Sequence, residues 1–415
     1  MRNRTYHAGL ISVMVLNFIA IVLFPAFSYA ASNYYVATNG NDGNSCSSAK
    51  SESTPKKTIN SGVGCLAPGD TLYVKSGTYN EWLNNSIPGG TSWSSPVTVS
   101  AYPGHTVIIK GPSGVDRTIH IQGANKKYII LNGLIVDAQN SNYDAIKLTR
   151  NGAGDEANHI RIQNCEIRNA KNIGIMVGVG SDSHEFLNLN LHDNGTVDVK
   201  GDGLYGYAIY IEGSNSVLEE SIIWNSGSWG VHVYNGHDNN ANNNIIRKNI
   251  IYDNAMKRNT GGVIIGSGSG NMVYNNIIRN NYKGIRLNRA AKVFHNTVYD
   301  NPSMAVELAS GGSSSEIRNN IFWKNGTNGI VGSAISSHNL SSNPGFVSES
   351  NNDFKLTSSS LAIDAGTNLS EVSDDFLGGS RPQGNKSDIG AYEYGVTVAD
   401  NQPPAPPTNL QFMSN

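Results

Sequence analysis

The chain has 415 residues, with 30 basic and 32 acidic side chains, 45 glycines and only 15% charged residues. This near balance of charge argues against a nucleic-acid partner, because nucleic-acid-binding domains usually carry a basic patch or stripe. With so few ions and so much Gly, Asn and Ser, we expect a surface covered by neutral polar groups rather than by ion pairs.

Residues 1–30 have the features of a secretory signal peptide. Two arginines within the first four residues precede an apolar run over residues 10–24, and Ser28-Tyr29-Ala30 offers small residues at a cleavage point. The apolar run is shorter than the roughly 20 residues that span a bilayer. Cleavage before Ala31 leaves 28 basic and 32 acidic side chains, a net charge near −4 (28 − 32). We therefore expect a secreted or cell-surface monomer that has no membrane partner after the signal is removed.

Residues 31–110 are predicted to form an N-terminal cap and the first coils of a repetitive structure. Cys46 and Cys65 lie close in sequence and would meet an oxidising compartment, so we expect a disulfide between them. The third cysteine, Cys165, is expected to be buried. The elements predicted in this segment are strands at 34–36, 71–74 and 96–99 and a short helix at 56–65.

From Tyr128 to Val331 one short pattern returns every 20 to 32 residues: an Asn-flanked apolar pair, then a small residue with three strand formers. Such a period is typical of a solenoid. Short strands separated by Gly and Asn favour a parallel β-helix, and the spacing is too short for propeller blades of about 40 residues. The second apolar residues of the pairs are Ile135, Ile167, Leu191, Ile223, Ile251, Ile278, Val298 and Phe322.

Asparagine recurs at the same place in successive coils. Stacked amides can hydrogen-bond along the axis of a solenoid. Asparagine also tolerates the left-handed backbone that a sharp corner demands. We therefore expect asparagine ladders at the corners.

Both ends of the chain resemble one family. Ala67-Pro68-Gly69-Asp70-Thr71-Leu72-Tyr73-Val74 near the start, and Ser360–Gly366 and Asp388–Glu393 near the end, are similar to segments of secreted right-handed parallel β-helix proteins of the pectate-lyase-like superfamily. The resemblance covers roughly residues 33–394. It implies an all-β, right-handed parallel β-helix with a core at 111–340.

The same resemblance implies a closing segment at 341–394, and the different, Pro-rich composition of residues 395–415 predicts a tail. Because the superfamily contains lyases, hydrolases, epimerases and non-catalytic binders, the resemblance does not choose a chemistry. The closely spaced aspartates typical of its calcium-dependent lyases and its polygalacturonases are not found in this sequence.

Seven strands between residues 145 and 308 share the order small, aliphatic, variable, aliphatic. Side chains alternate along a strand, so the aliphatic columns must face the core and the variable column must face outward. The outward column reads Lys147, Met176, Tyr210, His232, Ile264, Arg286 and Glu307. The outward position two residues further on adds Glu212, Tyr234 and Asn288.

This column predicts a binding face for an acidic polysaccharide. Coils stack at about 4.8 Å, which places Tyr210 and His232 on adjacent rungs and His232 and Arg286 roughly 10 Å apart. Lys147 and Arg286 would flank an aromatic–imidazole centre with positive charge. Tyr210, Tyr234 and Trp229 are expected to offer flat faces to sugar rings, with Glu212, Asn288 and Glu307 as further substrate contacts.

The chemistry that suits this column is β-elimination from a uronic acid. Arg286 or Lys147 would neutralise the carboxylate, and His232 or Tyr210 would exchange the protons. An ordinary imidazole titrates near pH 6.5, so we expect His232 to act as a base at neutral pH.

Several alternatives stay open. The column can be merely a solvated face of a non-catalytic glycan binder or structural protein. An epimerase is also compatible with these residues. Glycoside hydrolysis is disfavoured, because Glu212 and Glu307 lie four rungs, or about 19 Å, apart. Asp198 and Asp202 in a Gly-rich insertion are a weak indication of calcium.

Overall fold

The computed structural model describes residues 31–198, 201, 206–255 and 259–396. Contacts divide the chain into residues 1–30 and residues 31–415. The predicted signal peptide and nearly all of the predicted tail therefore lie outside the described residues. Within the described part, no helix is long and apolar enough to cross a membrane.

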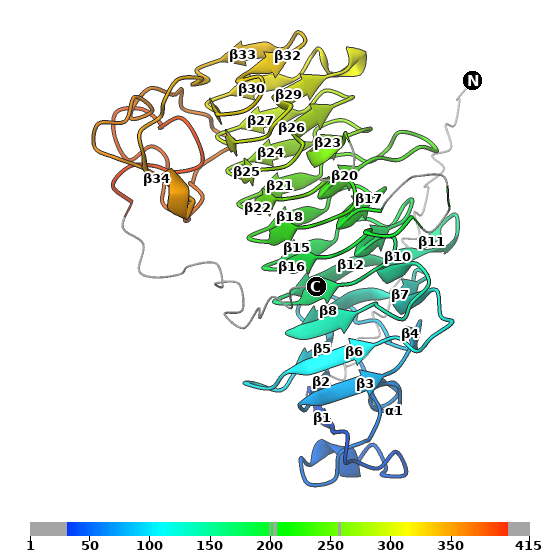
Figure 1. Ribbon diagram of the computed structural model, residues 1–415. Helices are drawn as coiled ribbons and strands as arrows, with labels where there is room; N and C mark the ends of the chain where they lie inside the picture. The colour runs from blue at the N-terminus through cyan, green and yellow to red at the C-terminus, as the bar shows by residue number, and fades with distance from the viewer. Residues whose placement is uncertain (1–30, 199–200, 202–205, 256–258, 397–415) are drawn as a thin grey trace, which may run out of the picture. The chain divides into compact units, whose positions relative to one another are not determined.

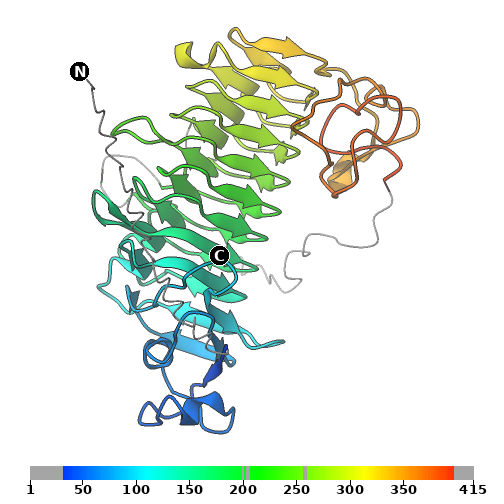
Figure 2. The ribbon, with the colours of Figure 1, turned by 180° about the vertical axis from the view of Figure 1, so that it is seen from behind.

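The described residues from Asn33 to Ser337 wind into coils whose strands stack in three long parallel sheets (Figure 1). The chain passes through sheets 1, 2 and 3 in turn and then begins the next coil, as Figure 2 shows from behind. In both views the strands of successive coils lie one above another, which agrees with the all-β solenoid that the repeat predicts.

Sheet 1 begins in the cap and ends at the last coil. Its strands are β1 (Asn33–Val36), β2 (Thr71–Val74), β5 (Val97–Ala101), β8 (Lys127–Asn132), β12 (Asn158–Gln163), β15 (Glu185–Leu187), β18 (Val217–Glu219), β21 (Ile245–Arg247), β24 (Met272–Tyr274), β27 (Lys292–Phe294), β30 (Glu316–Arg318) and β33 (Ile335–Ser337).

Sheet 2 follows sheet 1 across a short corner. Its strands are β3 (Gly77–Asn80), β6 (Val107–Lys110), β9 (Leu134–Asp137), β13 (Glu166–Arg168), β16 (Asn190–His192), β19 (Ile222–Trp224), β22 (Ile250–Tyr252), β25 (Ile277–Arg279), β28 (Thr297–Tyr299) and β31 (Ile321–Trp323).

Sheet 3 carries the strands on which the predicted site lies. They are β4 (Leu83–Asn84), β7 (Arg117–Gln122), β10 (Asp144–Gly152), β14 (Ile175–Val177), β17 (Ile209–Ile211), β20 (Val231–Val233), β23 (Gly261–Ile265), β26 (Lys283–Leu287), β29 (Met304–Leu308) and β32 (Ile330–Val331). A short strand, β11 (Asp155–Glu156), pairs antiparallel with β10.

The interior of the coils is aliphatic. Inward residues of neighbouring strands face each other in register, such as Ile209 opposite Val231 and Ile211 opposite Val233, and these four side chains are at most 1% exposed. Each coil thus buries its apolar columns against the coils above and below, as a solenoid requires. The predicted inward and outward directions of the sheet 3 columns are confirmed.

At the corner between sheets 1 and 2, one asparagine stacks its amide on the next coil, and the residue before it adopts the left-handed backbone conformation. Asn276 is fully buried, and its Nδ2 donates to Oδ1 of Asn296 at 3.0 Å, while Asn296 repeats the contact with Asn320 at 3.0 Å. The preceding residue, Asn275, takes the left-handed conformation with φ 54°. The predicted ladder is confirmed, but the stacked amide and the left-handed backbone belong to neighbouring residues.

The N-terminal cap closes the first coil. Cys46 and Cys65 form the predicted disulfide, and Cys165 is free and buried as predicted. The helix α1 (Ile59–Val63) is shorter than the predicted range 56–65. It starts at Thr58, whose side chain accepts a hydrogen bond from the backbone N–H of Ser61 at 3.2 Å.

After β33 the chain leaves the coils and packs on the outer side of sheet 2. Its antiparallel strands β34 (Phe346–Ser348) and β35 (Asp353–Leu356) belong to a cluster of apolar side chains that includes Ile277 and Ile321 of sheet 2. Lys248 pairs with Asp374 at 2.6 Å, which ties this C-terminal segment to the corner of the solenoid. Figure 1 shows the segment, in orange and red, beside the coils that carry β22 and β25.

Candidate functional site

The outer face of sheet 3 carries one continuous column of side chains. Strand pairing places Tyr210 opposite His232 on the neighbouring rung, and Arg286 two rungs beyond His232 with Ile264 between them. The full column, in register, is Asn84, His120, Lys147, Met176, Tyr210, His232, Ile264, Arg286, Glu307 and Val331. The predicted column is confirmed as geometry, and the chemical roles of its residues stay predictions.

Aromatic rings gather around His232. The imidazole stacks on Tyr210 with a centroid distance of 4.7 Å and an interplanar angle of 19°. Tyr234, which directly follows the strand of His232, stacks on it at 5.6 Å and 11°, and Tyr207 meets it edge-on at 4.6 Å. We call these four residues the ring cluster. Such offset and edge-to-face arrangements are the favourable ones for aromatic rings.

Tyr234 forms the solvent side of the ring cluster. Its side chain is 38% exposed. It lies against the backbone of Gly266, where a Cβ atom would come within 2.8 Å of its Cδ2. A side chain at position 266 would therefore collide with the ring of Tyr234, and glycine leaves the space that the ring occupies.

Burial makes His232 an unusual base. Removal from water lowers the pKa of the imidazole to about 3. Its Nδ1 atom is buried and has no hydrogen-bond partner among the described residues. The expectation that His232 titrates near pH 6.5 is therefore wrong, because the ring cluster desolvates the charged form. At neutral pH the imidazole is therefore uncharged.

Glu212, which directly follows β17, interacts with Tyr210 of that strand. Burial raises the pKa of Glu212, while the charge of His237, the hydrogen bond from the Tyr210 hydroxyl and the charge of Lys147 lower it. Burial and the neighbouring Glu212 carboxylate raise the pKa of Tyr210. The phenol is thus held in its protonated form, as a proton donor.

The far end of the site is a small ionic network. Nε of Arg286 donates to Oδ1 of Asn288 at 3.0 Å, and its Nη1 lies 3.5 Å from Oε2 of Glu307. Lys283 reaches the same Glu307 oxygen at 2.8 Å. The structure thus brings together Arg286, Asn288 and Glu307, which the sequence placed on the outer face of these strands. The carboxylate of Glu307 shields part of the charge of Arg286.

One predicted site residue, Trp229, does not lie as expected. Trp229 is buried, with 5% of its surface exposed, and its ring packs against the backbone of Gly261, so it offers no open face to a sugar. Ile264 is also only 7% exposed and leaves an apolar step between His232 and Arg286. For the weak calcium indication, Asp202 lies outside the described residues, and Asp198 adjoins that gap.

Sequence reasoning missed the lower part of the column and one ring. His120 follows Asn84 and precedes Lys147, and burial together with the charges of Arg117 and Lys147 lowers its pKa to about 4. The alternation Ile119-His120-Ile121 would have placed it outward if the column had been extended to β7. Tyr207 precedes its strand by two residues, and nothing in the repeat marks it.

No group of three or more His, Cys, Asp or Glu side chains suited to a metal ion occurs among the residues that the structure describes.

A family model described as "Right handed beta helix region" matches residues 177–346. The solenoid is a right-handed parallel β-helix of the pectate-lyase type. Pectate lyase Pel9A has the same β-helix, with a TM-score of 0.65 at 18% identity over 89% of this chain and 98% of that chain. A rhamnogalacturonan lyase gives a TM-score of 0.59 at 16% identity over 76% and 91% of the two chains.

One curated relative is similar in sequence. Pectate lyase PEL9 of Emericella nidulans (strain FGSC A4) is 26% identical over 214 residues, which is 49% of this chain and 49% of that protein. The chain thus matches about half the length of this relative. At these identities the likenesses establish the β-helix fold, and the activity has to be argued from the site.

Proposed function

We propose that this β-helix protein is secreted, binds an acidic polysaccharide along the outer face of sheet 3 and cleaves it by β-elimination. The observation that carries the proposal is the ring cluster around His232, whose members Tyr210 and His232 lie in one column between the cations Lys147 and Arg286. Relatives named as pectate and rhamnogalacturonan lyases support the same substrate class.

Lys147 and Arg286 can neutralise the substrate carboxylate, which is the first requirement of the reaction. A uronic acid gives up the proton next to its carboxylate only when the negative charge of that carboxylate is neutralised. Lys147 lies on the Tyr210 side of the cluster, two rungs away, and Arg286 lies two rungs beyond His232. Either cation can meet a carboxylate of a chain laid along the column.

His232 and Tyr210 carry out the two proton transfers, His232 as the base and Tyr210 as the acid. The uncharged imidazole takes the proton from the carbon next to the carboxylate, and a double bond forms to the neighbouring carbon as its C–O bond breaks. The protonated Tyr210 phenol, beside Glu212, gives its proton to the leaving oxygen. The base gains one proton and the acid loses one, so water must exchange the two before the next cycle.

Export is supported by two features. The segment at 1–30 has the order of a signal peptide, and the Cys46–Cys65 disulfide fits an oxidising compartment. The low share of charged residues and the near balance of basic and acidic side chains fit a glycan partner better than a nucleic acid.

The proposal is tested by incubating the purified protein with polygalacturonate, rhamnogalacturonan and alginate and following the ultraviolet absorbance of the unsaturated product. Product from one of these polymers supports elimination. Binding of a polymer without product, and with no change in the polymer by NMR, rejects it. Altered uronate stereochemistry without new chain ends would instead show an epimerase.

A non-catalytic glycan binder is the second candidate. Two observations favour it: Glu307 already pairs with Arg286 and Lys283, and the buried Ile264 interrupts the polar column. A binder would keep its affinity for the polymer when His232 is replaced, since the buried imidazole would then serve only to support Tyr210 and Tyr234.

A further inference from the structure

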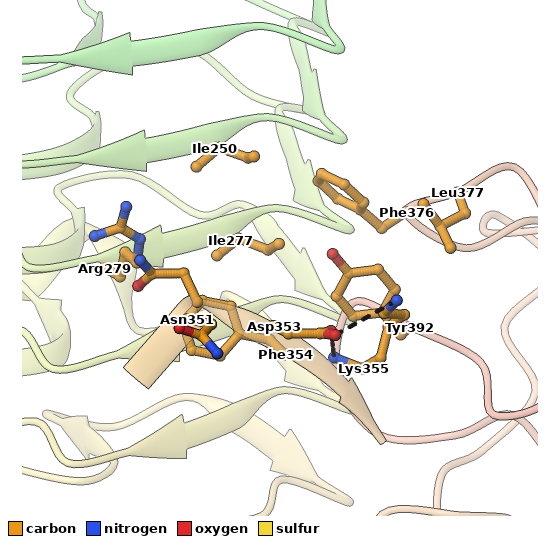
Figure 3. Close-up of a pocket in the computed structure, with 11 residues that line it drawn as sticks. Ile250, Ile277, Arg279, Asn351, Asp353, Phe354, Lys355, Phe376, Leu377 and Tyr392 are labelled. Atoms are coloured by element: carbon orange, nitrogen blue, oxygen red, sulfur yellow. Dashed lines mark hydrogen bonds and ion pairs between the residues drawn. The ribbon is translucent and has the colours of Figure 1, made fainter. Parts of the chain in front are cut away.

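A hollow lies on a different face of the solenoid from the ring cluster, between sheet 2 and the C-terminal segment (Figure 3). Its volume is about 310 Å³. Ile250 and Ile277, which begin β22 and β25, form its floor, and Phe354 of β35 closes one wall. A volume near 300 Å³ is at the small end of ligand pockets, and it suits one sugar ring rather than a polymer.

Arg279 brings a positive charge to this hollow. In Figure 3 its guanidinium lies on one side of the two isoleucines, and Phe376, Leu377 and Tyr392 lie on the other. The guanidinium makes no ion pair or hydrogen bond with the described residues, and its Nε is buried without a partner. It is positioned by stacking over the ring of Tyr252 at 4.3 Å. A half-buried guanidinium with free donors is a site for a carboxylate.

The stacking that holds Arg279 extends along sheet 2. The rings of His192, Trp224 and Tyr252 occupy facing positions on successive rungs and are nearly parallel, with interplanar angles of 10° and 8°. Arg279 is the next member of this column. The guanidinium therefore stands on a rigid support, at the edge of the hollow.

Other residues that line the hollow are suited to hydroxyl groups. Asp353 pairs with Lys355 at 3.5 Å and keeps carboxylate oxygens beside the hollow, and Asn351 lines it on the Arg279 side (Figure 3). The hydroxyl of Tyr392 also lines the hollow, and burial, assisted by Asp353 and Asp375, raises its pKa and keeps it a donor. An anion without hydroxyls, such as sulfate, would meet repulsion from Asp353 and gain nothing from the apolar floor.

We propose that this hollow is a second binding site, for a single uronic acid residue: Arg279 takes the carboxylate, the isoleucine floor takes the C–H face of the ring, and Asp353, Asn351 and Tyr392 take its hydroxyls. This second site lies on sheet 2, whereas the ring cluster lies on sheet 3. The second site would therefore hold the glycan at a point away from the bond that is cleaved. The choice of a uronic acid rests on the proposed function.

The test measures binding of galacturonate to the full exported chain by ligand-observed saturation-transfer NMR. Arg279→Gln removes the charge without breaking any ion pair of the described residues. We expect its affinity for galacturonate to fall at least about tenfold, because a lost charged hydrogen bond has that effect. Arg279→Lys keeps the charge and should restore part of the affinity. Galactose, which has no carboxylate, should bind wild type at least about tenfold more weakly than galacturonate.

A matched control is Arg318→Gln. Arg318 lies on the outer face of sheet 1, where it pairs with Glu316 at 2.8 Å, and its replacement should leave galacturonate binding unchanged. Equal affinities of wild type and Arg279→Gln, or of galacturonate and galactose, would overturn the site. A crystal soaked in galacturonate should show the carboxylate on Arg279, and an empty hollow at saturating ligand would overturn it too.

The elimination assay on the same wild-type preparation separates this inference from the proposed function. Unsaturated product without binding that depends on Arg279 would reject the second site and leave the lyase. Binding that depends on Arg279 without any unsaturated product would reject the lyase and leave the second site.

Discussion

The imidazole of His232 and the phenol of Tyr210 stack at 4.7 Å on facing positions of β20 and β17. This contact joins a base that burial keeps uncharged to an acid that burial keeps protonated. Two groups whose pKa values are pushed apart in this way can divide the proton transfers of one reaction. The account of the protein as a lyase depends on this pair.

The pH dependence of cleavage distinguishes this base from an ordinary histidine. A base must be unprotonated, so kcat/KM falls below its pKa in the free enzyme. With the pKa of His232 at about 3, activity should show no loss from imidazole protonation between pH 6.5 and 4.5. A base of ordinary pKa 6.5 would lose about 50-fold between pH 6.5 and 4.5. Measuring kcat/KM across this range decides between the two, and a loss of that size would contradict the assignment.

The Arg286–Glu307 contact predicts a gain of binding. Glu307 shields Arg286 at 3.5 Å and itself repels a polyanion. Glu307→Gln should therefore lower KM for the acidic polymer by about threefold to tenfold at low salt, and the effect should shrink as salt screens the charges. The matched control is Glu316→Gln, which frees Arg318 on sheet 1 in the same way. Equal effects of the two variants would show that only net charge matters and that the sheet 3 column is no binding face.

The asparagine ladder predicts where stability is concentrated. Nδ2 of Asn296 donates to Val273 O at 2.8 Å and to Asn320 Oδ1 at 3.0 Å, and its Oδ1 accepts from the buried Asn276. Asn296→Ala leaves those buried groups without partners and should lower the free energy of unfolding by about 2–5 kcal/mol. The exposed Asn142 is the control, and its replacement by Ala should change that free energy by less than about 0.5 kcal/mol in denaturant titrations. Similar values for both variants would contradict the ladder's role.

Buried neutral histidines predict a loss of stability in acid. Burial lowers the pKa of His184 and His232 to about 3 and that of His295 well below its usual range. Below pH 6.5 the unfolded chain binds protons that the native protein cannot, so stability falls as the pH drops toward 3. The slope is up to about 1.4 kcal/mol per pH unit for each histidine. Asp144 acts in the opposite sense, since burial raises its pKa to about 6.

Denaturant titrations at pH 7 and pH 4.5 measure this dependence. His184→Gln, which removes one of the three histidines, should reduce the slope even though it also removes the hydrogen bonds to Ser181 and Ile160. A free energy of unfolding that does not change between the two pH values would contradict the burial of these imidazoles.

The repeat predicts most of the fold because its periodicity reflects direct contacts between neighbouring coils. The alternation Ile209-Tyr210-Ile211 fixes which side faces the core, and one register then orders the whole outward column. The Asn276 ladder follows from the same repetition. The C-terminal segment could be identified only by resemblance, and its place on sheet 2 could not be predicted. Its contacts, such as that of Asn275 with Asp374, join residues 99 positions apart and have no period.

The site was predicted in outline but not in its electrostatics. The column gave Tyr210 and His232 as neighbours, yet the burial that lowers the pKa of His232 is not visible in it, and Tyr207, whose ring also contacts His232, lies outside the repeating strand positions. The expectation for Trp229 was wrong because the residue precedes its strand and packs against Gly261, a contact between coils that the pattern of a single coil does not contain. Burial of a polar ring by its neighbours is a property of three-dimensional packing.

The replacement of His232 by asparagine, assayed for unsaturated product, tests the central claim most directly. His338→Asn is the matched control, because His338 is an exposed histidine in the left-handed conformation that asparagine tolerates. The account predicts that His232→Asn lowers kcat/KM by about 100-fold or more, as expected for loss of a general base, while polymer binding and His338→Asn activity remain. Wild-type rates in a folded His232→Asn protein would contradict it.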